Sequence, residues 1–223
     1  MRGILLDIEG TTTPISFVYD VLFPFARKHL DAYLPKTDLT NLKQEYDEDV
    51  RKGLRPPAWS STPLQYVEWL MDQDRKSTAL KKLQGEIWLA GYEKGELHGE
   101  VFPDVPPSLE RWHAQNKDVR IFSSGSVLAQ RLIFSTTRAG DLTRFLKGYF
   151  DTTTGPKNEV SSYTQIAKSF GLGASDIVFV SDVSRELDAA RAARMETLLC
   201  VRPGNHPQPP HNHTTITTFD GLS

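Results

Sequence analysis

Two acidic residues, Asp7 and Glu9, stand one residue apart directly after an apolar run, in the segment ILLDIEGTTTP. In an open parallel sheet, ligands bind at the carboxyl ends of the strands, so acids at this point would project into a binding crevice. Unpaired buried carboxylates are costly, and a cation, most simply Mg²⁺, is the natural compensation. The segment therefore predicts an acidic strand end that binds a metal ion.

Further polar residues follow apolar runs later in the chain. Ser123 and Ser124 come after VRIF, Lys157 lies in the loop after Asp151, and Asp182 comes after IVFV. Together with the first two acids they supply a nucleophile, hydroxyl and N–H donors, an ammonium group and another metal-binding acid. Phosphoryl transfer needs this set of groups. We expect all of them at one edge of a sheet.

The elements that must position these residues can be read from the hydrophobic pattern. Short apolar runs bounded by turn residues predict buried parallel strands at 3–8, 119–122, 177–180 and 197–201, with a short last strand at 215–219. Helices are predicted between them at 105–115, 161–170 and 184–194. This alternation predicts an α/β protein with a Rossmann-like parallel-sheet core.

The stretch from about residue 17 to 95 breaks this alternation, because it contains helical patterns and no convincing strand. Helices are predicted at 17–34, with a kink or restart at Pro24, at 63–71 after Thr62, and at 78–91 after Ser77. We therefore expect residues 1–15 and 98–223 to form the α/β core. Residues 16–97 are expected to form an α-helical cap inserted after the first strand.

Composition narrows the class of partner. The 223 residues contain 26 Lys and Arg against 28 Asp and Glu, without a basic cluster, which argues against nucleic acid. We expect no signal peptide and no membrane span, because acids interrupt the first apolar run and no run of 18 apolar residues exists. Cys200, the single cysteine, is interpreted as a buried apolar group. A cytoplasmic monomer acting on a small molecule is expected.

The order of the motifs DIEGTTT, FSSGS, GPK and VSDVSRE resembles that of the haloacid dehalogenase superfamily of Mg²⁺-dependent phosphatases. The segments DIEGTTTPISFVYDVLFPFA, IFSSGSVLAQ, FDTTTGPKNEVSSY, SDVSRELDAA and VRPGN are similar to its enolase-phosphatase family, the acireductone synthases of methionine salvage. Glu9 supports this narrower family, since most phosphatases of the superfamily carry a second Asp there. The resemblance covers nearly the whole chain.

The resemblance implies how the first strand end works. Asp7 would attack phosphorus and form an aspartyl-phosphate. One Mg²⁺ per subunit would be held by Asp7, Asp182 and the backbone carbonyl of Glu9, so that nucleophile and phosphate can approach. The carboxyl of Glu9 would then be available for proton transfer. Thr11 is expected to brace the turn.

The resemblance also implies that Ser123 and the N–H of Ser124 bind the transferring phosphoryl oxygens, and that Lys157 neutralises charge on both phosphate and nucleophile. Two of these segments have a simpler interpretation. The serines could cap the helix predicted from VLAQRLIF. Glu186 could hold a metal-bound water or could merely favour its helix N-terminus. The HNH sequence at 211–213 has a metal-binding spacing, but its proline-rich surroundings argue against a metal site there.

The substrate implied by the resemblance is a phosphorylated diketone, 2,3-diketo-5-methylthiopentyl 1-phosphate. Enolisation followed by phosphoryl transfer would yield the acireductone 1,2-dihydroxy-3-keto-5-methylthiopentene and phosphate. The enolisation base stays open between Glu9 and a residue of the cap. Two alternatives are another phosphomonoesterase of the superfamily, which would differ mainly in its cap, and a phosphoreceiver or phosphate-binding module. Receiver modules lack a long insertion after the first strand.

Overall fold

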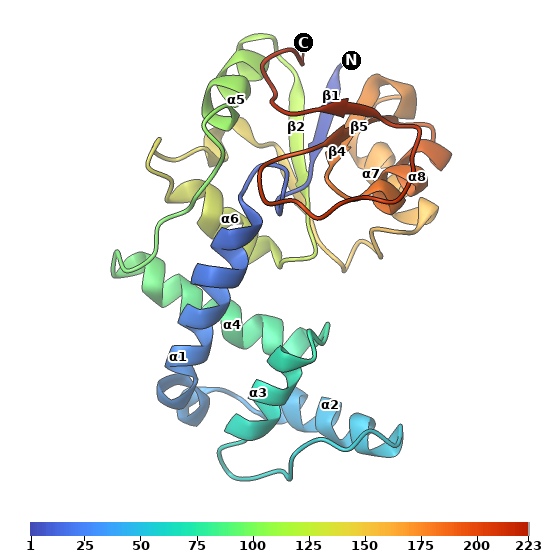
Figure 1. The fold of residues 1–223 in the computed structure, drawn as a ribbon. Coiled ribbons are helices and arrows are strands. Elements are labelled where there is room, and N and C mark those ends of the chain that lie inside the picture. The colour runs from blue at the N-terminus through green and yellow to red at the C-terminus, as the bar shows by residue number, and fades with distance from the viewer. Residues whose placement is uncertain (223) are drawn as a thin grey trace. The chain divides into compact units, whose positions relative to one another are not determined.

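The computed structural model describes residues 1–222, and its sheet has six parallel strands in the order β3-β2-β1-β4-β5-β6 (Figure 1). The predicted α/β class with a parallel-sheet core is confirmed. Strand β1 lies in the interior of the sheet between β2 and β4, so the residues that follow these three strands meet at one edge. The strands are β1 (Gly3–Leu6), β2 (Asp118–Phe122), β3 (Gly148–Phe150), β4 (Ile177–Ser181), β5 (Glu196–Cys200) and β6 (Thr214–Ile216).

Helices cover both faces of this sheet. In Figure 1, α7 (Val160–Phe170) and α8 (Ser184–Ala192) lie on one side, and α5 (Val105–Ala114) and α6 (Val127–Ser135) lie on the other. All four residues of β1 are buried, as its uninterrupted apolar run predicts for a strand covered on both faces. Side chains of α7 and α8 pack with those of β1 and β4 into one hydrophobic core.

The structure differs from the predicted elements in three places. Strand β3 was not expected, because its three half-buried residues, GYF, carry no apolar run. Helix α2 (Thr40–Arg51) was missed because Leu42 and Asp49 are its buried residues, which leaves no continuous apolar stripe. Strand β6 ends before Phe219, whose ring packs against Trp112 instead of continuing the strand.

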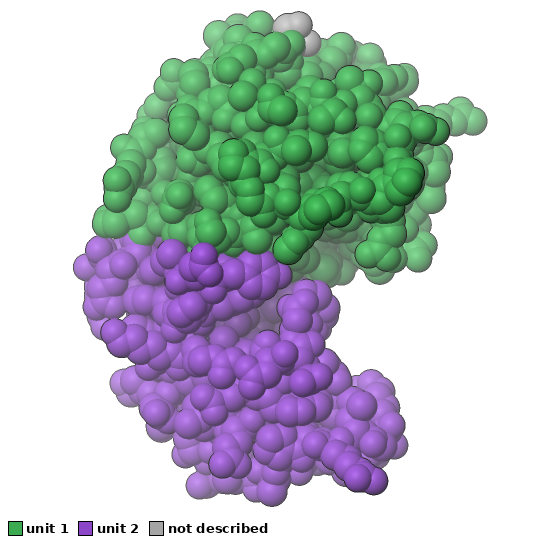
Figure 2. Space-filling model, viewed as in Figure 1, with its two compact units in different colours: residues 1–18, 98–223 green, residues 19–97 purple. Residues whose placement is uncertain are grey.

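The chain divides into two compact units, coloured separately in Figure 2: residues 1–18 with 98–223, and Tyr19–Leu97. The second unit holds α1 (Phe23–Tyr33), α2, α3 (Leu64–Asp72) and α4 (Thr78–Glu93), and none of its residues lies in a strand. A six-residue π-helix, Phe17–Leu22, precedes α1. Within residues 1–222, no helix has the length and apolar character needed to cross a membrane.

Helix starts in the second unit follow local chemistry. Pro24 lies in the first turn of α1, where its missing N–H costs nothing, so the helix restarts there as predicted. Ser77 caps α4 by accepting a hydrogen bond from the amide of Leu80 at 2.9 Å. The buried Asp49 is compensated by Arg75 at 2.5 Å and by the Tyr66 hydroxyl at 3.0 Å.

Candidate active site

The register of the sheet aligns the predicted site residues. Leu6 pairs with Ile121 of β2 and with Val180 of β4, and the amide of Asp7 donates to the carbonyl of Val180 at 3.0 Å. Asp7 and Asp182 therefore follow neighbouring strands at the same edge, and the serine loop follows β2 on the other side of β1. Sheet geometry alone brings these chain segments together.

Lys157 forms ion pairs with two carboxylates. Its Nζ lies 2.8 Å from Asp7 Oδ1 and 2.6 Å from Glu186 Oε2, and its side chain is 10% exposed. The hydroxyl of Tyr163 on α7 donates to the Lys157 carbonyl at 2.6 Å, which positions the lysine backbone. Burial alone would lower the pKa of Lys157, but the two carboxylates outweigh it and raise that pKa. The lysine is therefore a permanent cation beside Asp7.

Ser181 connects the same two acids and was not predicted as a site residue. Its Oγ lies 3.1 Å from Asp7 Oδ2 and 3.0 Å from Glu186 Oε2, and it accepts the amide of Val183 at 3.1 Å. A hydroxyl has one proton, so it donates to one carboxylate at a time. The available signal in the sequence was a hydroxyl residue at the end of β4, directly before Asp182.

The site holds more carboxyl groups than cationic groups. Burial, followed by the nearby Asp7 carboxylate, raises the pKa of Asp182 to about 8. Burial and the same carboxylate raise the pKa of Glu186 to about 7, although Lys157 opposes the shift. One ammonium group thus faces three carboxyl groups in a buried setting. A bound cation would remove this imbalance.

The donor set fits Mg²⁺ on chemical grounds. Among residues 1–222, no three side chains of His, Cys, Asp or Glu gather into a metal-binding group. Asp7 and Asp182 follow neighbouring strands and offer two carboxylates, and the remaining ligands would be backbone or water oxygens. Mg²⁺ commonly binds in this way, because it keeps several waters and takes one or two carboxylates.

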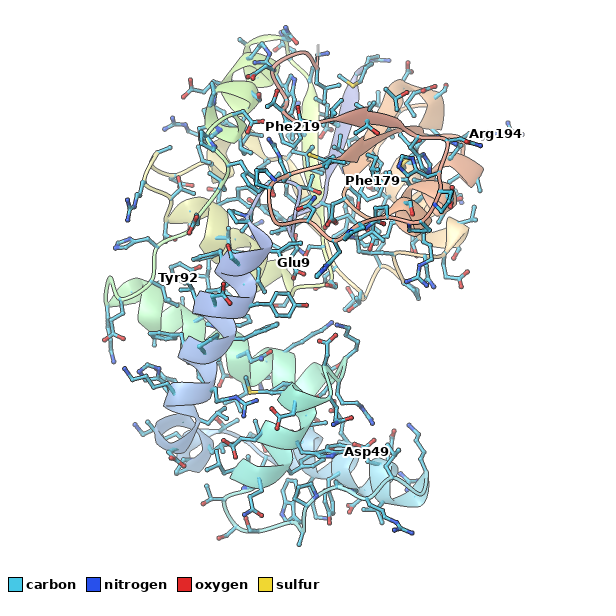
Figure 3. The ribbon with its side chains drawn as sticks, in the orientation of Figure 1. Glu9, Asp49, Tyr92, Phe179, Arg194 and Phe219 are labelled. Carbon is cyan, nitrogen blue, oxygen red and sulfur yellow. The ribbon has the colours of Figure 1, made fainter. Side chains whose placement is uncertain are left out.

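The loop after Asp7 is a tight turn built on one carbonyl. The amides of Thr11, Thr12 and Thr13 all lie within hydrogen-bond range of the Ile8 carbonyl, at 3.1, 2.9 and 2.9 Å. Thr11 thus contributes to the turn through its backbone, while its buried Oγ1 has no hydrogen-bond partner in the described part of the chain. The half-buried Glu9 lies in this loop, where Figure 3 labels it.

Gly10 allows the turn to form. Its φ of 66° is in the left-handed region, which favours glycine. A Cβ at this position would lie 2.4 Å from Asp182 Oδ2. The Asp182 carboxylate therefore lies directly against the loop that carries Glu9.

The structure corrects the interpretation that Ser123 and Ser124 cap the helix that follows them. The residue that caps α6 is Ser126, whose Oγ accepts the amide of Ala129 at 3.3 Å, so neither Ser123 nor Ser124 is the cap. Ser123 is buried and accepts the amide of Gly125 at 3.1 Å through its Oγ. Asp151 accepts the amide of Val127 at the start of α6, at 3.2 Å. The two serines thus lie just before a helix N-terminus, where anions bind favourably.

Glu186 and the histidine sequence have specific partners. Glu186 lies in the first turn of α8, but its carboxylate pairs with Lys157 instead of only facing the helix N-terminus. His213 is buried and contacts Asp188 Oδ1 at 3.0 Å and Thr197 Oγ1 at 2.9 Å. Its partners are those of a structural histidine. Cys200 is buried as predicted, and burial raises the pKa of its thiol to about 11.

An acidic strand end with a lysine beside it, on a parallel sheet of this order, defines a class of hydrolase. The chain belongs to the haloacid dehalogenase-like hydrolases, whose family model matches residues 1–194. It is 47% identical over 231 residues to enolase-phosphatase E1 of Synechococcus elongatus, covering 98% of this chain and 96% of that protein. The resemblance to the enolase-phosphatases that the motifs indicate is thereby confirmed.

Two further relatives extend the similarity. The chain is 46% identical over 242 residues to a probable bifunctional methylthioribulose-1-phosphate dehydratase/enolase-phosphatase E1 of Vitis vinifera, and it covers 47% of that longer protein. The crystal structure of the UTR4 protein of Saccharomyces cerevisiae superposes with a TM-score of 0.81 at 34% identity, and 99% of each chain is covered. The whole chain, including the helical insertion, therefore has a close structural counterpart.

Proposed function

We propose that this chain is an enolase-phosphatase of methionine salvage. It converts 2,3-diketo-5-methylthiopentyl 1-phosphate into 1,2-dihydroxy-3-keto-5-methylthiopentene and phosphate. The observation that carries the proposal is the buried contact of Lys157 with Asp7 at the end of β1, in a chain 47% identical to an enolase-phosphatase E1. The lysine pairs with Oδ1 of Asp7 and leaves Oδ2 to other partners. The charge of the carboxylate is thus compensated at one oxygen, while the other oxygen can attack phosphorus.

In the phosphoryl-transfer step, a carboxylate oxygen of Asp7 bonds to phosphorus while the bond from phosphorus to the substrate oxygen breaks. The leaving oxygen takes a proton and becomes the enol hydroxyl. Water then attacks the aspartyl-phosphate, which releases phosphate and restores Asp7. Lys157 lowers the repulsion between two anions throughout, and Ser123 with the N–H of Ser124 binds the phosphoryl oxygens.

Asp7, Asp182 and the Glu9 carbonyl would hold one Mg²⁺ per subunit. The bound ion would screen the charge of the nucleophile and the phosphate. The excess of buried carboxyl groups described above supports this assignment. So does the proximity of Asp182 to Gly10, since it lies beside the loop that contains the proposed carbonyl ligand.

Enolisation requires a base that removes a proton from C1 of the substrate. The carbonyl next to C1 acidifies this C–H bond, and the proton taken from carbon leaves an enolate whose oxygen is then protonated. Glu9 is our candidate, because it lies in the loop directly after Asp7 and would bind the ion through its backbone carbonyl, so its carboxyl would not be a metal ligand. A residue of the helical insertion is the alternative.

We assign the helical unit, residues 19–97, the role of a cap that selects the substrate. It is inserted into the chain soon after the acidic strand end and contains none of the proposed site residues. We further expect the enzyme to act as a cytoplasmic monomer. Balanced charge without a basic cluster supports a small-molecule substrate.

The half-reactions provide the test. Asp7→Asn keeps the shape of the side chain but removes the attacking charge, so phosphate release should stop. C1 hydrogen should still exchange with D₂O, because enolisation does not use this oxygen as a nucleophile. Proton NMR follows the exchange, and a phosphate assay follows the release. Retention of more than about a tenth of the phosphatase activity would exclude Asp7 as the nucleophile.

Glu9→Gln tests the enolisation base in the same assays. It should abolish C1 exchange, whereas a simple phosphomonoester, which needs no enolisation, should be affected less. Normal C1 exchange in this variant would remove Glu9 as the base and move the search to the helical unit. If the wild-type protein hydrolyses simple phosphomonoesters but not the diketo phosphate, it is a different phosphatase of the family.

A further inference from the structure

The loop after Asp7 is held from outside by the segment 201–222. The carbonyl of Gly10 accepts a hydrogen bond from Asn205 Nδ2 at 2.9 Å, and the carbonyl of Thr11 accepts one from Arg202 Nε at 3.1 Å. The amides of Thr11, Thr12 and Thr13 are satisfied locally at Ile8, whereas the carbonyls of Gly10 and Thr11 are bonded to these side chains. Their hydrogen-bonding requirement is met by side chains from a distant part of the chain.

Arg202 is held in one orientation. Its side chain is 3% exposed, and Nη1 and Nη2 lie 2.8 and 2.9 Å from Asp104 Oδ1 and Oδ2. The guanidinium carbon lies 4.5 Å from the ring centre of Phe102 and 4.7 Å from that of Phe219, which Figure 3 labels. A planar guanidinium paired through both nitrogens and packed on rings cannot rotate freely. Its Nε is thus aimed at the loop.

Asp104 is committed to this contact rather than to its own helix. It occupies the position before α5, yet its side chain makes no cap hydrogen bond there. Its Oδ2 instead also accepts the amide of Phe219 at 2.7 Å. The sequence prediction that α5 begins after Asp104 is right, but the carboxylate serves the segment 201–222 and not the helix start.

Asn205 reaches the same loop one residue earlier. Its Nδ2 also donates to the carbonyl of Cys200 at 3.1 Å, so the amide connects the end of β5 to Gly10. A Cβ on Gly10 would lie 2.9 Å from Asn205 Oδ1 and 2.4 Å from Asp182 Oδ2. Asn205 and Asp182 therefore flank the backbone directly beside Glu9.

We propose that Arg202 and Asn205 are positioning residues for the reaction, which hold the backbone of Glu9 in place relative to Asp7 and Asp182. They act through the carbonyls of Gly10 and Thr11 and touch neither substrate nor phosphate. The inference rests on the proposed function, because it assigns the Glu9 carbonyl to the cation. If the hydrogen bonds from Arg202 and Asn205 are lost, Asp7 and Lys157 remain in place, but the backbone carbonyl of Glu9 is no longer held where it would bind the cation.

Two mild variants and one matched control test the proposal. Arg202→Lys keeps the charge beside Asp104 but loses the planar fork, and Asn205→Ala removes both amide hydrogen bonds. Arg111→Lys is the control, because Arg111 also binds this segment, through the Phe219 carbonyl at 2.7 Å, but has no contact with the loop. Arg202→Ala is avoided, since it would leave the Asp104 carboxylate without its cationic partner.

The readouts separate positioning from stability. In Arg202→Lys and Asn205→Ala, kcat should fall and the Mg²⁺ dissociation constant measured by calorimetry should rise, each by about tenfold to a hundredfold, with KM nearly unchanged. Arg111→Lys should lower the melting temperature about as much as the two test variants do, but it should leave kcat and Mg²⁺ affinity at wild-type values. A comparable loss of Mg²⁺ affinity in the control would overturn the proposal, as would wild-type values in both test variants.

The assay keeps this proposal distinct from the proposed function. Each protein is measured with the diketo phosphate and with p-nitrophenyl phosphate. If the wild-type protein hydrolyses the simple ester but not the diketo phosphate, the enolase-phosphatase assignment is wrong. The positioning role of Arg202 and Asn205 would then be tested by kcat with the simple ester and by the Mg²⁺ dissociation constant. A wild-type protein that binds no Mg²⁺ would overturn both.

Discussion

Replacing Lys157 with methionine removes the only cation that contacts Asp7 in the described residues while keeping most of the side-chain volume. In the wild-type site the ammonium lies 2.8 Å from Asp7 and 2.6 Å from Glu186. The variant would leave the carboxyl groups of Asp7, Asp182 and Glu186 together without it. We expect lower stability, a large loss of phosphatase activity and uptake of a proton by the folded protein.

The size of the effect follows from the burial of the pair. Removing one partner of a buried ion pair costs about 3 to 5 kcal/mol. The cost should lie near the lower end, about 3 kcal/mol, because Glu186, whose pKa is already raised to about 7, can take up a proton. If the lysine stabilises the transition state by the same amount, kcat/KM falls on the order of a hundredfold.

The pH dependence of this loss has a definite sign. Without the ammonium, the pKa of the Glu186 carboxyl rises further in the folded variant. The folded variant therefore binds a proton that its unfolded chain has already released. Its stability then falls as pH rises. The difference in unfolding free energy between wild type and variant should therefore be larger at about pH 8 than at about pH 6.

Urea unfolding at both pH values measures the stability, and phosphate release measures the activity. Lys168→Met, which removes an exposed lysine of α7, is the matched control and should change neither. A folded Lys157→Met protein with activity within about twofold of wild type would refute the role of the lysine in phosphoryl transfer. An equal loss of stability at both pH values would refute the electrostatic argument.

Two further predictions concern the cation and His213, which lies directly before β6. EDTA should stop turnover, Mg²⁺ should restore it, and Asp182→Asn should weaken Mg²⁺ binding by about tenfold or more in calorimetry; full activity after chelation would contradict the metal assignment. Burial lowers the pKa of His213, with Arg191 and His211 adding to the shift and Asp188 opposing it. The unfolded chain therefore binds this proton first, so the melting temperature should fall as pH drops through about 6.5, less steeply in His213→Gln; equal slopes would contradict this.

The strand ends could be predicted because the determinants are local. A buried parallel strand needs an apolar run, and the residue that follows it must reach the sheet edge. Asp7, Asp182 and the serine loop were placed in this way, and the sheet register aligns them. Lys157 follows no predicted strand, because GYF carries no apolar run, so its place at this edge was predicted from the set of polar residues and from the GPK motif and not from its own surroundings.

The contacts among these residues could not be predicted, because they depend on side-chain direction. Ser181 is the last residue of a fully buried strand, so its sequence environment reads as core. Glu186 was expected to interact with its helix or with a metal-bound water. Its contact with Lys157 depends on how α8 is placed over the end of the loop after β3, which hydrophobic periodicity does not determine.

The two hydrogen bonds that hold the loop after Asp7 show the limit of local reasoning most clearly. They connect residues 191 and 195 positions apart in the chain. The turn satisfies its own amides through Ile8, so a sequence such as DIEGTTT contains enough information to form it. Its carbonyls of Gly10 and Thr11 need partners that arrive only when the segment after β5 has packed. The proposed nucleophile therefore directly follows the first strand of the sheet, whereas the loop beside it is hydrogen-bonded to residues that follow the fifth strand.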